Sequence, residues 1–132
     1  MASNLETTKR GYELFGQGDI ATLVKELVGD NCTWISPGPP DKLPWAGHFK
    51  GKSGVADFFT RVNQNLEFTE FAPGEFIEQG NTVVAIGRST ARSKKTGKTI
   101  KDDWVHVFKY DQGKLVLFRE YTDTAAAVLG TS

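Results

Sequence analysis

A histidine and a glutamate in the last third of the sequence are the strongest candidates for acid–base chemistry. In the strand-like segment 99–110, His106 shares one face with aromatic residues such as Trp104, because side chains alternate across a strand. Glu120 lies on an apolar face of the next strand-like segment, 115–123. An imidazole and a carboxylate in an apolar pocket form a general acid–base pair. A buried structural His–Glu pair is the alternative interpretation.

The turn between these two segments decides whether His106 and Glu120 face the same space. A three-residue loop at 111–113, with Gly113 in the left-handed conformation beside a bulge, places His106 opposite Phe118 and on a diagonal to Glu120. A two-residue turn instead sends Glu120 to the opposite face, because a shift of one residue reverses every side chain. Only the first turn brings the two polar groups together.

One face of the strand-like segment 82–93 carries only small side chains. They are Val83, Ala85, Gly87, Ser89 and Ala91. Such a face cannot fill the space in front of it, so either a cavity or a closely packed helix must lie there.

Helical patterns occupy the first half of the chain, and strand patterns occupy the second. A capping box at Ser3 begins a helix that ends before Gly16, Asp19 caps a second helix over 20–28, and a third helix begins at Ser53. The predicted strands cover 32–36, 67–78, 82–93, 99–110 and 115–123. This order predicts an α+β fold, with a curved antiparallel sheet wrapped around three helices in a single domain, residues 1–132.

Charge and composition exclude several classes of partner and site. The 16 basic and 16 acidic residues balance, so we expect no nucleic acid partner, although a local basic cluster is compatible with this balance. The apolar runs are far shorter than the roughly 20 residues of a membrane helix, and no secretory signal is visible, which predicts a cytoplasmic protein without a membrane partner. Cys32 is the only cysteine, and His48 lies far from His106 in sequence, so we expect neither a metal nor a cofactor.

Motifs spread over nearly the whole chain resemble one known family. They are 30–38 around Trp34, 45–51, 104–108 around His106, and 119–124. Together they are similar to the SnoaL-like branch of the nuclear transport factor two-like superfamily, which includes ketosteroid-isomerase-related and polyketide-cyclase-like proteins. The resemblance implies a cone-shaped α+β barrel with a deep apolar pocket, and a homodimer formed through the outer face of the sheet.

The resemblance also implies roles for individual residues. Limonene-epoxide-hydrolase-like members carry an Arg-Asp-Tyr run in the last strand, and the matching run here places the carboxylate at Glu120. Their other charged residues fall at Gly87 and Ser89, and the base of the ketosteroid isomerases falls at Ser36, so neither reaction is matched in full. His106 stands near the oxyanion donor of the isomerases. The implied pocket lining is Trp34, Trp104, Phe118 and Ser89, with Tyr12 as a phenol donor.

Three functions remain open at this point. The first is a cofactor-independent isomerase, hydrolase or cyclase that acts on a small apolar or carbonyl-bearing molecule, with Glu120 as the base and His106 as its partner or as an oxyanion donor. The second is a non-catalytic binding protein that holds a hydrophobic small molecule in the same pocket. The third is a dimeric interaction module whose interface would comprise exposed Val105, Val107, Leu115 and Leu117.

Overall fold

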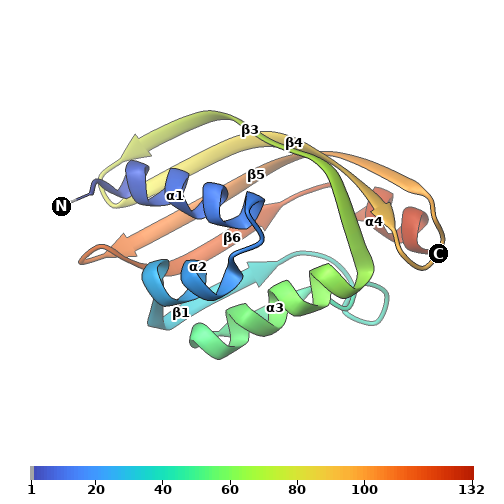
Figure 1. The fold of residues 1–132 in the computed structure, drawn as a ribbon, viewed down its shortest axis with the longest axis horizontal. Helices are drawn as coiled ribbons and strands as arrows, with labels where there is room; N and C mark the ends of the chain where they lie inside the picture. The colour runs from blue at the N-terminus through green and yellow to red at the C-terminus, as the bar shows by residue number, and fades with distance from the viewer. Residues whose placement is uncertain (1) are drawn as a thin grey trace.

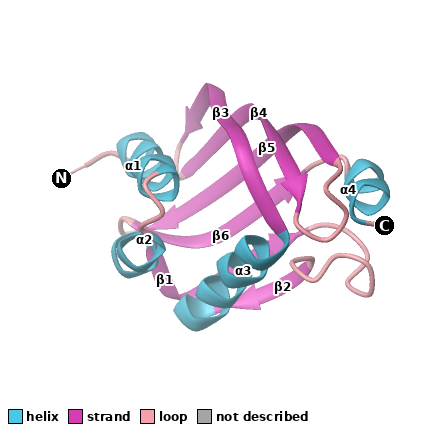
Figure 2. Cartoon of the chain, turned by 45° about the vertical axis from the view of Figure 1, so that its right-hand side comes forward, coloured by secondary structure: helices cyan, strands magenta, loops and turns pink. Residues whose placement is uncertain are grey.

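One six-stranded sheet curves around three helices in the computed structural model, which describes residues 2–132 (Figures 1 and 2). The strands lie in the order β2-β1-β6-β5-β4-β3. Neighbouring strands are antiparallel except β1 and β6, which are parallel. In chain order the elements are α1 (Asn4–Gly16), α2 (Ile20–Leu27), β1 (Val28–Ser36), β2 (Gly47–Lys50), α3 (Gly51–Asn65), β3 (Leu66–Gln79), β4 (Thr82–Ser93), β5 (Thr99–Asp111), β6 (Lys114–Tyr121) and α4 (Thr124–Thr131).

The predicted α+β fold is confirmed, and the structure adds two short elements to it. Strand β2 follows the proline-rich loop after β1 and pairs with β1 over four residues. A strand of four residues is too short to show a recognisable alternating pattern in the sequence. Helix α4 follows β6 at the C-terminal end, where the sequence showed only an alanine-rich tail. Strand β1 also begins earlier than predicted, at Val28.

The first two predicted helix starts are confirmed by side-chain caps, whereas α3 begins at Gly51, two residues before the predicted Ser53, and has no side-chain cap. The Ser3 hydroxyl accepts from the backbone N–H of Glu6 at 3.1 Å, and the Asp19 carboxylate accepts from that of Thr22 at 3.1 Å. Asp123 caps α4 in the same way. These bonds satisfy N–H groups that have no partner inside the helix. Within residues 2–132, no helix has the length and apolar character needed to cross a membrane.

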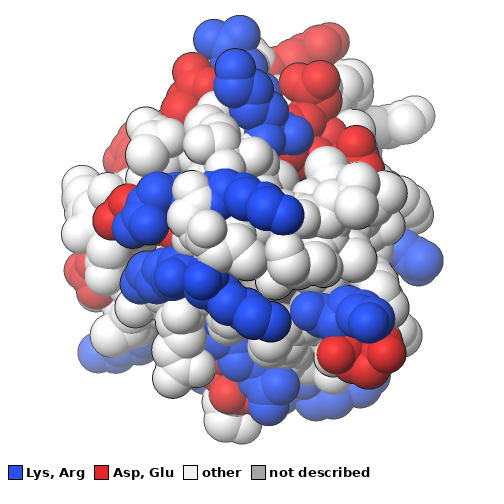
Figure 3. Space-filling view, turned by 90° about the vertical axis from the view of Figure 1, so that its right-hand side faces the viewer, with Lys and Arg blue, Asp and Glu red and all other residues white. Residues whose placement is uncertain are grey.

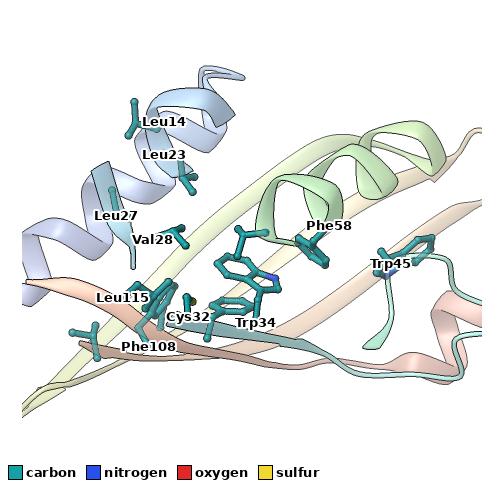
Figure 4. Close-up of a cluster of buried hydrophobic side chains, with 14 of the residues drawn as sticks. Leu14, Leu23, Leu27, Val28, Cys32, Trp34, Trp45, Phe58, Phe108 and Leu115 are labelled. Carbon is teal, nitrogen blue, oxygen red and sulfur yellow. The ribbon is translucent and has the colours of Figure 1, made fainter. Parts of the chain in front are cut away.

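The hydrophobic core lies between the helices and the concave face of the sheet (Figure 4). Helix α2 turns Leu23 and Leu27 toward this core, where they meet residues of β1 such as Val28. Cys32 is fully buried among these side chains, and burial raises the pKa of its thiol to about 11. Cys32 is therefore a small residue of the core.

The turn between β5 and β6 has only two residues, Gln112 and Gly113, and both have positive φ. Of the two turns considered from the sequence, the structure contains the two-residue turn and not the three-residue loop. Glu120 nevertheless faces the inside of the sheet, because a bulge at Val116 shifts the register by one residue shortly after the turn. His106 consequently pairs directly with Glu120, instead of lying on a diagonal to it.

The same bulge changes the composition of the outer face of the sheet. Leu115 was expected on that face, but it precedes the register shift and is 1% exposed in the core. Val105, Val107 and Leu117 are half-buried on the outer face. A homodimer through this face remains a prediction, and its interface would not include Leu115.

The small-residue face of β4 is turned inward, as its composition predicts. Val83 and Ala85 are fully buried, and Ser89 and Ala91 border a cavity. The indole of Trp104, from the neighbouring strand β5, lies over Gly87. A side chain from an adjacent strand and a cavity therefore share the space in front of this face.

The end of the molecule near the C terminus carries lysine and arginine side chains across much of its surface (Figure 3). The connection between β4 and β5 lies at this end and contributes Lys94, Lys95 and Lys98. Lys94 donates to the carbonyl of Asn63 in α3, and Lys98 donates to the carbonyl of Ser132. Part of this local basic cluster therefore ties the β4–β5 connection to its neighbours.

We expect the substitution Gly87→Ala to destabilise the fold by about 1–3 kcal/mol, as overpacking does. An added Cβ would lie 2.6 Å from both the Trp104 ring and the backbone oxygen of Ala72, and the latter cannot move aside cheaply. Gly74→Ala in β3 is the matched control, since its Cβ would meet no atom closer than 3.5 Å. Urea unfolding of both variants measures the difference. Equal stability of the two would contradict the packing described above.

We also expect stability to fall at alkaline pH through Tyr110. Burial raises the pKa of this phenol to about 12, although its hydrogen bond with Thr8 opposes the shift. The unfolded chain ionises near 10.0, so the stabilisation is fully present below that pH and is lost as the pH rises toward about 12. Urea unfolding between pH 8 and pH 12 should show a steeper decline for the wild type than for Tyr110→Phe. Identical slopes would show that Tyr110 ionises equally in both states.

Candidate active site

A cavity of about 140 Å³ lies between the concave face of the sheet and the helices. Its surface is predominantly apolar, with a small number of polar side chains. The site residues assigned from the sequence all line it: Tyr12 from α1, Trp34 from β1, Ser89 from β4, Trp104 and His106 from β5, and Phe118 and Glu120 from β6. Elements from both ends of the chain thus converge on one cavity.

Three polar side chains on this wall form a hydrogen-bonded chain. The Tyr12 hydroxyl lies 2.7 Å from Nδ1 of His106, and Nε2 of His106 lies 2.7 Å from Oε2 of Glu120. His106 is 4% exposed, whereas Glu120 is only partly buried. The helical layer and two strands of the sheet are therefore joined at a single imidazole.

Tyr12 takes part in this chain as a neutral phenol. Burial raises the pKa of the Tyr12 phenol far above its ordinary value, and the nearby charge of Glu120 raises it further. The phenol therefore keeps its proton. When its hydroxyl donates a hydrogen bond to Nδ1 of His106, the imidazole carries a proton on Nε2 and donates a hydrogen bond to Glu120.

This arrangement leaves one carboxylate oxygen available. Both nitrogens of His106 are occupied, so the imidazole has no nitrogen left for a molecule in the cavity. Oε1 of Glu120 has no hydrogen-bond partner anywhere in the described part of the chain, residues 2–132. A carboxylate that is oriented through one oxygen and free at the other can accept or return a proton.

Aromatic rings hold the polar chain in place. The rings of Trp104 and His106 stack with centroids 4.0 Å apart and an angle of 10° between their planes. On the neighbouring strands β1 and β6, Trp34 stacks on Phe118 with centroids 3.8 Å apart, and the centroid of the Phe118 ring lies 5.0 Å from that of the imidazole. The imidazole plane is therefore fixed by stacking as well as by its two hydrogen bonds.

Two positions that the family resemblance implied lie outside the cavity lining. Ser36, which aligns with the base of the ketosteroid isomerases, is 2% exposed, and its hydroxyl has no hydrogen-bond partner within residues 2–132. Gly87 is covered by Trp104. Neither supplies a second charged group to the cavity.

The structure adds polar residues that the sequence analysis did not assign to the site. Asp102, Thr122 and Asp123 line the cavity. The signal for Asp102 was present in the sequence, since it lies two residues before Trp104 on the same strand face. Trp45, from the loop between β1 and β2, also lines the cavity, and no periodic pattern marks a loop residue.

Comparisons with known proteins show the family to which this chain belongs. The SnoaL-like domain family matches residues 8–118. Patulin synthesis protein F from Aspergillus clavatus is 29% identical over 120 residues, which cover 83% of this chain and 61% of that protein. The chain spans about three fifths of the length of the curated relatives that it matches.

Solved structures show the same fold along nearly the whole chain. An NTF2-like protein from Burkholderia xenovorans is 31% identical with a TM-score of 0.87, and the match covers 98% of this chain and 95% of that one. TerC, which was co-crystallised with polyporic acid, is 27% identical with a TM-score of 0.83, and 97% of each chain is covered. The family match over most of the sequence and the shared fold show that this chain belongs to the SnoaL-like domain family, within the NTF2-like superfamily.

Proposed function

We propose that the protein binds a small carbonyl-bearing molecule in its cavity and catalyses proton transfer on it without a cofactor, as an isomerase or cyclase. Family membership supports the coarser statement, a small-molecule binding or cyclase- and isomerase-type role. In the finer proposal Glu120 is the acid–base residue, and His106 is a positioning residue. Trp34, Trp104 and Phe118 form the apolar walls.

The free oxygen of Glu120 is the observation that carries this proposal. Oε2 is held by His106, so Oε1 has a defined position in a mostly apolar space. There a carboxylate can remove a proton from the carbon next to a carbonyl group and return it to another atom of the same molecule. Such a transfer gives an isomerisation, and the same carbanion gives ring closure where a second carbonyl lies within reach.

The volume of the cavity supports a compact ligand. A dry cavity of about 150 Å³ accommodates one benzene molecule. At about 140 Å³, the cavity here matches one six-membered ring. The names of two relatives agree with small-molecule chemistry, because one refers to patulin synthesis and the other to bound polyporic acid.

Non-catalytic binding is the second candidate. The position of Ser36 favours it. Ser36 aligns with the base of the ketosteroid isomerases, but it is a buried serine that does not line the cavity, so it supplies no second acid or base there. In this case Glu120 and His106 would only orient the ligand. The two functions differ in turnover, and both require a molecule in the cavity.

We expect Glu120→Gln to slow turnover by about 10²- to 10⁴-fold, the usual contribution of a general base. A suitable probe is cyclohex-3-en-1-one, a single-ring ketone whose conversion to the conjugated isomer is followed by absorbance. The amide retains the size of the carboxylate but cannot accept the proton. Glu75→Gln is the matched control, since Glu75 is an exposed residue of β3 outside the cavity.

The same experiment separates the two candidates. Isomerisation by the wild type that survives in Glu75→Gln and is lost in Glu120→Gln supports the enzyme. Binding of the ketone to the wild type, seen by calorimetry, without any isomerisation would favour the binding protein. Full activity of Glu120→Gln would remove Glu120 from the acid–base role.

A further inference from the structure

A second polar pair lines the cavity on strands β4 and β5, away from His106. Ser89 and Asp102 are direct partners in the register of these two strands, and both line the cavity. Asp102 lies four residues before His106 on the same strand face, so their Cα atoms are roughly 13 Å apart along the strand. Trp104 stands between them on that face. The cavity therefore has two separate polar regions.

The Ser89 hydroxyl has no protein partner. Ser89 is 7% exposed and borders the cavity, and its hydroxyl makes no hydrogen bond to any residue from 2 to 132. A hydroxyl on a mostly apolar wall gains stability from a hydrogen bond with another polar atom. Because this hydroxyl borders the cavity, a ligand atom can supply that contact.

The carboxylate of Asp102 is held in a fixed orientation beside Ser89. Its Oδ1 accepts from the backbone N–H of Asp123 at 3.1 Å, and its Oδ2 accepts from the hydroxyl of Thr122. Burial raises the pKa of this carboxyl, the N–H of Asp123 lowers it, and the charge of Glu120 raises it again.

We infer that Ser89 and Asp102 form a subsite for a hydroxyl group of the ligand. One ligand hydroxyl can accept a hydrogen bond from Ser89 and donate one to Asp102. The inference rests on the proposed function, since it takes the carbonyl side of the same molecule to lie at Glu120. The substrate class is then a hydroxylated cyclic ketone of one ring, with its hydroxyl group on the side away from the carbonyl.

Two ring ketones of nearly equal shape test this subsite. In 4-hydroxycyclohexanone and 4-methylcyclohexanone, the group opposite the carbonyl is a hydroxyl in one and a methyl in the other. Deuterium exchange of the protons next to the carbonyl, followed by NMR in D₂O, measures proton transfer on either ketone. We expect the wild type to favour the hydroxylated ketone in kcat/KM by about tenfold, which corresponds to one net hydrogen bond.

The substitution Ser89→Ala should remove most of this preference. It should lower kcat/KM for 4-hydroxycyclohexanone by about tenfold and leave the value for 4-methylcyclohexanone unchanged. Asp102→Asn keeps one acceptor oxygen, which can serve either Thr122 or Asp123, and should also reduce the preference. Ser36→Ala is the matched control, because Ser36 is likewise a buried serine without a partner but does not line the cavity.

The outcomes separate this inference from the proposed function. Exchange that depends on Glu120 but shows no preference between the ketones would overturn the subsite and leave the proposed function standing. An equal loss on both ketones in Ser89→Ala would also overturn it, since that result indicates a structural effect. If the wild type neither binds nor exchanges either ketone, both proposals are wrong.

Discussion

The side of the sheet that Glu120 faces is the constraint on which the candidate site depends. A two-residue turn joins β5 to β6, and its register alone would point Glu120 away from the cavity. The extra residue of the bulge, Val116, reverses that outcome within a few residues of the turn. The inward position of Leu115 and the pairing of Glu120 with His106 both follow from this one irregularity.

The buried imidazole of His106 needs a hydrogen-bond partner for its second nitrogen, and helix α1 supplies one. A buried polar group that loses its hydrogen-bond partner costs about 1–3 kcal/mol, because no water replaces that partner. Tyr12 completes the hydrogen bonding of His106 from the helical layer, and stacking on Trp104 fixes the plane of the imidazole. The position of α1 over the sheet and the orientation of Glu120 are therefore coupled through one ring.

The cavity exists because small residues and large rings are distributed unequally along the sheet. The inward face of β4 carries Ala85, Ser89 and Ala91, which leave space, while the neighbouring strands carry tryptophan and phenylalanine side chains that enclose it. Trp104 fills the part of this space in front of Gly87. What remains is a volume of about 140 Å³ with polar groups in two regions.

Local patterns in the sequence determined the class of fold, the helices α1, α2 and α3, the caps of the first two, and the inward face of β4. These features depend on periodicity and on contacts within a few residues. The sequence also identified His106 and Glu120 as polar residues on apolar faces. Only the tertiary structure decided that they pair directly, because a bulge has no reliable local signature. It also placed Tyr12 on the imidazole and Asp102 beside Ser89, since these contacts join segments that are distant in sequence and depend on how the sheet curves around the helices.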